Sequence, residues 1–229
     1  MKKFCIILFF MSISIFGLTG CSATRWIFQL FTSEEFSPHV EYFLVFHPNE
    51  TSSQFGGYGY LMDYSQDGYV YVAGKFPCTY GEKGVPKTKR GDRKTPLGKY
   101  RIELIRSKED QYNQFGPYSI LIDYPNHFDI IARRTGSGIS IHGGRIKPTN
   151  GCIRILNGTS NKPKFGKVNI TEIVKRCQTG DIVFIVDSIN AKMLGEPGEC
   201  LSEEASRKWI YLLENEMDYL ELLQELNSL

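Results

Sequence analysis

The sequence predicts a mainly β domain, a β-sandwich or open barrel with one internal helix and a C-terminal amphipathic helix. Short runs rich in β-branched and aromatic residues recur through the middle of the chain, separated by Gly, Pro, Asn and Asp. Such closely spaced short strands are typical of sandwiches and barrels. With 229 residues, 41% of them hydrophobic, the chain can bury one full core. The predicted strands are 41–46, 69–73, 100–105, 119–123, 139–142, 152–156 and 182–186.

Two helices complete the predicted domain. Asn169 or Thr171 can cap a helix over residues 170–178, and Gly180 can end it. The tail from Ser202 to Asn227 has a helical period. We expect this tail to pack on the domain, and a partner-binding helix is the alternative. Its apolar stripe consists of Trp209, Leu212, Leu213, Met217, Leu220, Leu223 and Leu226.

The first forty residues predict export and lipid anchoring. Lys2 and Lys3 precede an apolar run over residues 5–16, and Leu-Thr-Gly-Cys closes the segment at Cys21. The run is shorter than the about 20 apolar residues that span a bilayer, which indicates a signal peptide. The closing tetrad resembles the lipobox of bacterial lipoproteins, in which the cysteine is acylated. We therefore expect an extracytoplasmic protein anchored to the membrane through Cys21, at the periplasmic face or outer membrane if the organism has two membranes. The alternatives are an uncleaved signal anchor and secretion with Cys21 incidental.

Residues 140–144 read Ser-Ile-His-Gly-Gly, and residues 149–154 read Thr-Asn-Gly-Cys-Ile-Arg. This pattern brings the imidazole of His142 and the thiol of Cys152 together between glycines. A neighbouring imidazole or imidazolium lowers the pKa of a thiol and so populates the nucleophilic thiolate. Glycines allow main-chain N–H groups to approach a reacting carbonyl closely, as an oxyanion hole requires. The pattern predicts a cysteine enzyme in which Cys152 is the nucleophile and His142 is first the general base and then the general acid.

The segments 140–144 and 149–154 resemble the catalytic signature of the L,D-transpeptidase catalytic domain family. That signature is His-Gly followed by Ser/Thr-x-Gly-Cys-(Ile/Val/His)-(Arg/Asn). Residues 91–98, Gly-Asp-Arg-Lys-Thr-Pro-Leu-Gly, look like the family's second motif, a turn that opens a strand. The resemblance covers Glu41 to Val186. It implies transfer of an acyl group between peptidoglycan stem peptides through a thioester on Cys152, which crosslinks or remodels the cell wall. Hydrolysis, by an L,D-carboxypeptidase or an enzyme that releases protein from peptidoglycan, is the alternative chemistry. An inactive peptidoglycan-binding lipoprotein is a further alternative.

The resemblance also implies roles for the neighbours of this pair. The backbone carbonyl of Gly143 is expected to orient His142, and Gly151 and Arg154 to support the site or bind substrate. For Arg154, binding of a stem-peptide carboxylate or support of the thiolate stands beside a structural ion pair as the alternative. We interpret Thr95 in the second motif as turn chemistry rather than as a ligand.

Composition and spacing limit the other function classes. The formal net charge of +2 gives no basis for nucleic-acid binding, which usually shows as a strongly basic face. No cofactor is implied, and no metal site is expected because Cys-x-x-Cys and His-x-x-x-His spacings are lacking. No disulfide pairing can be deduced for Cys78, Cys177 and Cys200. The expected organisation is a signal peptide over 1–20, a lipidated tether over 21–40, a catalytic domain over 41–187, and a C-terminal linker and helix over 188–229.

Overall fold

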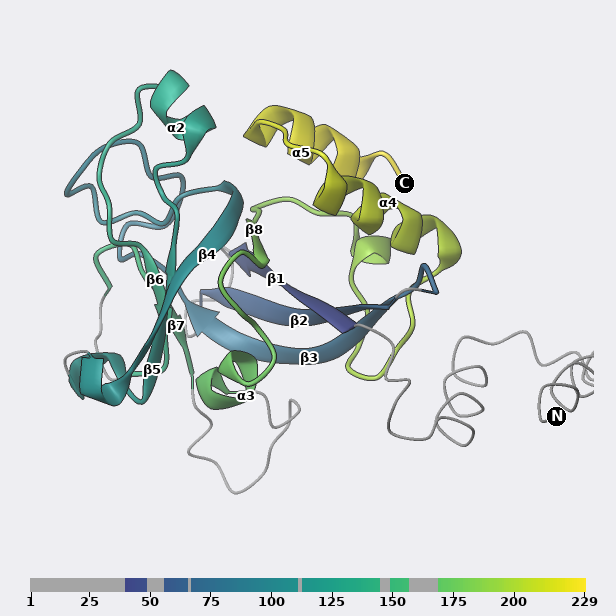
Figure 1. Cartoon of the computed structure of the whole chain (residues 1–229). Coiled ribbons are helices and arrows are strands. Elements are labelled where there is room, and N and C mark those ends of the chain that lie inside the picture. The colour runs from purple at the N-terminus through teal and green to yellow at the C-terminus, as the bar shows by residue number, and fades with distance from the viewer. Residues whose placement is uncertain (1–39, 49–55, 66, 111–112, 145–148, 157–168) are drawn as a thin grey trace, which may run out of the picture. The chain divides into compact units, whose positions relative to one another are not determined.

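The computed structural model describes residues 40–48, 56–65, 67–110, 113–144, 149–156 and 169–229. The predicted signal peptide and Cys21 lie outside the described residues, and so does nearly all of the tether. Eight strands form a closed barrel in the order β1-β2-β3-β7-β6-β5-β4-β8 (Figure 1). The pairs β1–β8 and β6–β7 are parallel, and the other neighbouring strands are antiparallel. The strands are β1 (Val40–Pro48), β2 (Gly57–Ser65), β3 (Val70–Thr79), β4 (Gly98–Ser107), β5 (Tyr118–Ile122), β6 (Ser140–His142), β7 (Ile153–Ile155) and β8 (Ile182–Ile185).

Two hydrophobic clusters lie on opposite faces of the barrel wall. Because side chains alternate along a strand, Leu44 and Phe46 of β1 enter one cluster while Phe43 and Val45 enter the other. The first, the barrel-interior cluster, contains residues from all eight strands and from α3 (Ile170–Val174). The second, the helix-covered cluster, joins the outer faces of β1, β2, β3 and β8 to the C-terminal helices. Both faces of β1 and β8 are therefore buried.

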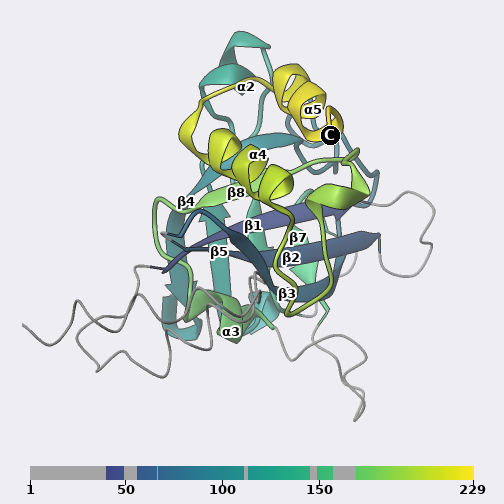
Figure 2. The same cartoon turned by 90° about the vertical axis from the view of Figure 1, so that its right-hand side faces the viewer.

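The C-terminal tail forms two helices, α4 (Glu203–Glu214) and α5 (Tyr219–Asn227), rather than the single helix that its periodicity predicts. The first helix ends at Glu214, and Asp218 begins the second because its side chain accepts hydrogen bonds from the backbone N–H groups of Leu220 and Glu221. The break changes the helical phase, so Leu220 is 74% exposed although it was expected in the apolar stripe. Both views show α4 and α5 on the outer side of the barrel (Figures 1 and 2).

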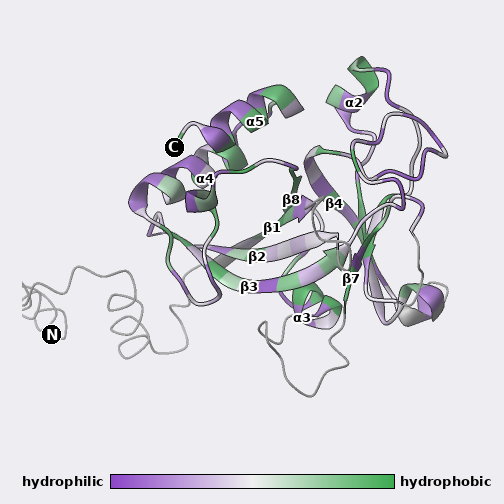
Figure 3. Cartoon of the chain, turned by 180° about the vertical axis from the view of Figure 1, so that it is seen from behind, coloured by the Kyte–Doolittle hydropathy of each residue, from purple (hydrophilic) through white to green (hydrophobic). Residues whose placement is uncertain are grey.

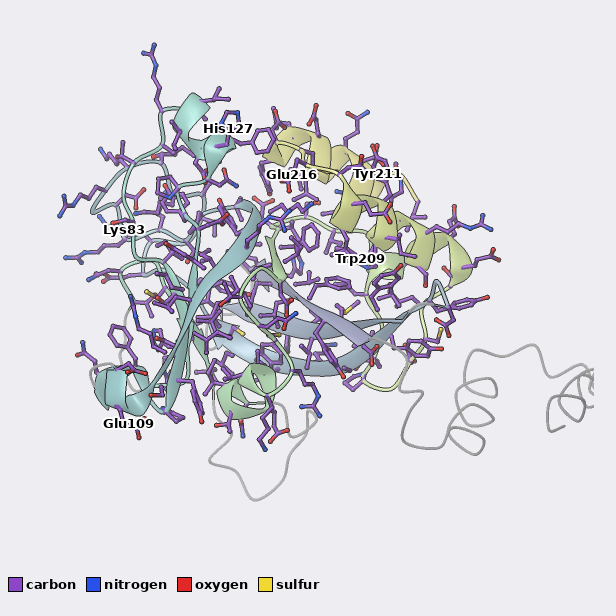
Figure 4. All side chains as sticks on the ribbon, viewed as in Figure 1. Lys83, Glu109, His127, Trp209, Tyr211 and Glu216 are labelled. Carbon is purple, nitrogen blue, oxygen red and sulfur yellow. The ribbon has the colours of Figure 1, made fainter. Side chains whose placement is uncertain are left out.

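Trp209 is the centre of the helix-covered cluster. It is fully buried, its indole N–H donates to the carbonyl of Met193 at 2.8 Å, and its ring lies 5.2 Å from both Phe43 and Phe184. Tyr211, on the same helix, is 47% exposed (Figure 4). Hydrophobic and hydrophilic residues accordingly alternate along α4 and α5 (Figure 3). The tail packs on the domain, as its amphipathic pattern predicts.

The remaining elements are short. The predicted helix over 170–178 is confirmed as α3, capped by Asn169, but it ends at Val174. A further helix, α2 (His127–Ile131), begins with a capping box formed by Asn126 and Asp129. None of the described helices is long and apolar enough to cross a membrane. Three 3₁₀ turns are present among the described residues: η1 (Lys108–Asp110), η2 (Asn113–Phe115) and η3 (Ala191–Met193).

Candidate active site

The parallel pairing of β6 and β7 brings the two predicted catalytic segments together. Their register places Ile141 opposite Ile153 and His142 opposite Arg154. Cys152 immediately precedes β7, so it lies one strand away from the segment that ends in His142. Although ten residues separate them in sequence, His142 and Cys152 thus lie on adjacent parallel strands, with Cys152 level with the start of β6 and His142 at its end.

His142 is fully buried and neutral at neutral pH. Burial, and to a smaller extent the positive charge of Arg154, lowers the pKa of its imidazole to about 4. The ring packs edge-to-face on Phe115 of η2, with centroids 5.3 Å apart and an interplanar angle of 78°. Neither ring nitrogen has a hydrogen-bond partner among the described residues. The orienting role of the Gly143 carbonyl therefore stays a prediction.

Cys152 is half-buried, and the structure reverses the expected direction of its pKa shift. Burial raises the pKa of the thiol, while the Ser140 backbone and the charge of Lys87 act in the opposite direction without overcoming it. The sulfur Sγ lies 3.7 Å from the carbonyl oxygen of Gly138. The resting pair is therefore a neutral thiol and a neutral imidazole. The sequence expectation failed because an imidazole favours the thiolate only if it is protonated, and burial keeps His142 neutral.

Arg154 ties β7 to the glycines that follow His142. Its Nε donates to the carbonyl of Gly144 at 2.5 Å, and its Nη1 is buried without a hydrogen-bond partner among the described residues. Within the part of the chain that the structure describes, Arg154 forms no ion pair, so the structural ion pair considered from sequence is not observed. A buried guanidinium N–H without a partner is unfavourable, and an anionic group is the acceptor that it binds best.

Glycine is required at two positions of the site, at Gly144 by lack of space and at Gly151 by lack of space and by its positive φ. A Cβ on Gly144 would lie 1.8 Å from the carbonyl oxygen of Gln114, so the backbone after His142 packs directly on the turn that carries Phe115. Gly151 has φ of +131°, and a Cβ there would lie 2.6 Å from the carbonyl oxygen of Lys94. Gly151 thus lets the segment before Cys152 lie against the Thr-Pro turn.

Two buried threonines that sequence reasoning did not assign to the site hold the Cys152 segment. The Thr95 hydroxyl accepts from the N–H of Gly81 at 2.8 Å and donates to the carbonyl of Gly151 at 2.9 Å. The Thr149 hydroxyl lies 2.6 Å from the carbonyl oxygen of Cys152 and 3.0 Å from that of Tyr80. Thr95 is therefore more than turn chemistry, because it connects the second motif to Gly151, the residue before Cys152. Its place in a motif that resembles the family was the only available signal.

The described residues offer no ready-made metal centre. No three His, Cys, Asp or Glu side chains come together among them in a way that could hold a metal ion. Cys78 and Cys177 are free, buried thiols, so neither is joined to Cys200.

Comparison with known proteins identifies the family. The model of the L,D-transpeptidase catalytic domain, YkuD, matches residues 58–185, which is more than half of the chain. The protein belongs to the L,D-transpeptidase catalytic domain family, and this membership supports a cell-wall function of that family's kind. No curated protein matches the chain.

Solved structures support the same fold. A mutant of the helical cell shape determining protein Pgp2 from Campylobacter jejuni superposes with a TM-score of 0.51 at 17% identity, covering 75% of this chain and 54% of that one. Bd1075 of Bdellovibrio bacteriovorus superposes with a TM-score of 0.50 at 18% identity, covering 76% of this chain and 56% of that one. The chain therefore spans little more than half the length of either structure.

Proposed function

We propose that this protein is a cysteine-dependent L,D-transpeptidase that acts on peptidoglycan stem peptides. The observation that carries the proposal is the pairing of β6 with β7, which sets the buried, neutral imidazole of His142 one strand away from the half-buried thiol of Cys152. A neutral imidazole is the form that accepts a proton, so it can act as a general base at neutral pH. Family membership supplies the substrate class.

The proposed reaction has two acyl-transfer steps. The Cys152 sulfur attacks the carbonyl of an L-centre linked to a D-residue, typically in the meso-diaminopimelate–D-Ala bond, and the thiol proton passes to His142. The C–N bond breaks, the leaving D-amino acid takes that proton, and a thioester remains. An acceptor amine then attacks the thioester, and its proton returns through His142 to the Cys152 sulfur. Formation of the oxyanion is expected to be supported by backbone N–H groups at Gly151 and Cys152.

Arg154 is proposed to bind a carboxylate of the stem peptide. Its Nη1 is a buried donor without a partner among the described residues, on the strand that begins next to Cys152. Binding a carboxylate would satisfy this donor with a charge-assisted hydrogen bond. The carbonyl of Gly144 already fixes the guanidinium through Nε.

The test follows the products of purified peptidoglycan fragments with tetrapeptide stems by mass. The protein is compared with Cys152→Ala and with Cys177→Ala, a matched loss of a buried thiol whose pKa burial raises to about 12. Crosslinked dimers or exchanged D-amino acids that are lost only in Cys152→Ala are the expected result. Tripeptides alone would indicate a hydrolase that uses water as acceptor. Products identical to those of Cys152→Ala would refute an enzyme and indicate a binding protein.

The proposal includes a lipid anchor at Cys21, outside the described residues. The tetrad that ends at Cys21 and the apolar run before it support this part. Several acyl chains hold a protein stably on a bilayer, since each buried CH₂ contributes about 0.8 kcal/mol. Metabolic labelling with a fatty-acid analogue should disappear in Cys21→Ala, and labelling that persists would rule out the anchor.

A further inference from the structure

The loop between β3 and β4 buries a charged pair in an otherwise exposed basic segment. Lys87 is 3% exposed, and its Nζ lies 2.7 Å from Oδ1 of Asp92 and 3.1 Å from the carbonyl oxygen of Lys89. Other cations of the same loop, such as Lys83, lie on the surface (Figure 4). A lysine is seldom fully buried unless it is paired, and burying an ion pair rarely adds stability. The burial of this pair therefore indicates a role for Lys87 other than stability.

Asp92 is held firmly without its lysine partner. Its carboxylate accepts hydrogen bonds from the backbone N–H groups of Thr88 at 2.8 Å, Lys89 at 3.0 Å and Lys94 at 3.1 Å. Burial alone would raise the pKa of Asp92, but the hydrogen bonds from Lys87 and from these N–H groups hold it well below its usual range. The anion is thus fixed by the loop backbone, and it in turn fixes the position of the ammonium.

Lys87 is packed between the two segments that contact the Cys152 region. Its backbone N–H donates to the carbonyl of Thr95 at 2.9 Å, and Thr95 binds Gly151 through its hydroxyl. On the other side, a Cβ on Gly136 would lie 2.9 Å from Cε of Lys87. Two residues further along that segment, the carbonyl of Gly138 faces the sulfur of Cys152.

The charge of Lys87 reaches the thiol. Burial raises the pKa of Cys152, and the charge of Lys87 acts against that increase. On the neighbouring strands β6 and β7, His142 is neutral and Arg154 is engaged with the carbonyl of Gly144.

We propose that Lys87, held in place by Asp92, is a positioning residue that stabilises the thiolate of Cys152 through its charge. A thiolate that forms in a half-buried site loses solvation, and a fixed cation nearby replaces part of it. The proposal rests on the proposed function only in taking Cys152 as the reacting group. No contact between Lys87 and the substrate is required.

The test measures the rate at which iodoacetamide alkylates Cys152 in the full chain as a function of pH, read by mass on the peptide that contains Cys152. Lys87→Met should move the rate profile to higher pH and reduce the rate at pH 7 about tenfold, the change that one pKa unit produces. Lys87→Arg, which keeps the charge, should retain most of the rate. The matched control is Lys75→Met, which removes the cation of another ion pair, Lys75–Glu196, at 2.7 Å.

A second variant separates the charge effect from misfolding. Lys87→Met leaves the buried Asp92 carboxylate without its cation, which lowers the stability of the fold. Combining Lys87→Met with Asp92→Asn also removes the negative charge. This double variant should unfold at a urea concentration close to that of the unaltered protein. The double variant should still react slowly with iodoacetamide at pH 7. An unchanged profile in the folded double variant, or an equal change in Lys75→Met, would overturn the proposal. Alkylation needs no peptidoglycan, so a lysine effect without transpeptidase products would refute the proposed function alone.

Discussion

The burial of His142 makes the stability of the fold depend on pH in a defined window. The ordinary pKa of the imidazole is 6.5, and burial lowers it to about 4 in the folded protein. Between these values the unfolded chain binds a proton that the folded chain does not. The free energy of unfolding should therefore be constant above the unfolded pKa and fall as the pH drops from 6.5 to about 4. At about 1.4 kcal/mol per pH unit, this interval corresponds to about 3 kcal/mol.

The measurement is urea unfolding of the protein and of His142→Gln between pH 7.5 and pH 4. The substitution removes the titrating group, so its own effect on stability matters less than the change in slope with pH. The difference in unfolding free energy between the two proteins should change by about 3 kcal/mol across the window. Carboxylates that titrate near pH 4 act equally in both proteins and cancel. Parallel curves would refute the assignment of a buried, neutral imidazole.

Three further predictions concern packing around the site and the core. Thr95→Val should lower the free energy of unfolding by about 1–3 kcal/mol and slow peptidoglycan turnover, because it leaves a buried N–H and a buried carbonyl without a hydrogen-bond partner. Thr88→Val, on the exposed part of the same loop, should unfold at the same urea concentration as the unaltered protein. Equal urea midpoints for the two variants would contradict the role of the Thr95 hydroxyl. Gly144→Ala should cost about 1–3 kcal/mol or more through the clash of its Cβ, and an unchanged thermal midpoint would show that the contact is not tight. Trp209→Ala should cost about 3–5 kcal/mol in urea unfolding, whereas Tyr211→Ala should change it little; similar losses would contradict the packing of α4.

Strands that bury β-branched and aromatic residues could be predicted from the sequence, but β2 could not. Gly57–Ser65 contains Gly and Asp, which are depleted in strands, so local propensity argues against it. It becomes a strand because it pairs along its whole length with β1 and nearly so with β3. Gly59 shows the reason for the unusual composition, since a Cβ there would lie 2.3 Å from the ring of Phe76. Tertiary packing overrides propensity at this position.

The candidate site was predictable in its members but not in its electrostatics. Glycine-flanked His142 and Cys152 are visible in the sequence because their order and spacing are those of a known motif. Burial of the imidazole cannot be read from the motif, because it depends on Phe115 and on the barrel around it. The thiol pKa was therefore predicted in the wrong direction. Thr95 and Lys87 lie more than fifty residues before Cys152, and only the fold brings them close.

The late position of β8 in the chain affects the order in which the barrel assembles during folding. It closes the barrel by pairing with β1 on one side and β4 on the other, and Nδ1 of nearby His47 donates to the carbonyl of Val186 across 139 residues of sequence. Joining such distant segments is the entropically demanding part of folding. Cys152 precedes β8 in the chain, so the barrel wall around the His-Cys motif is complete only once residues 182–185 have joined β1 to β4.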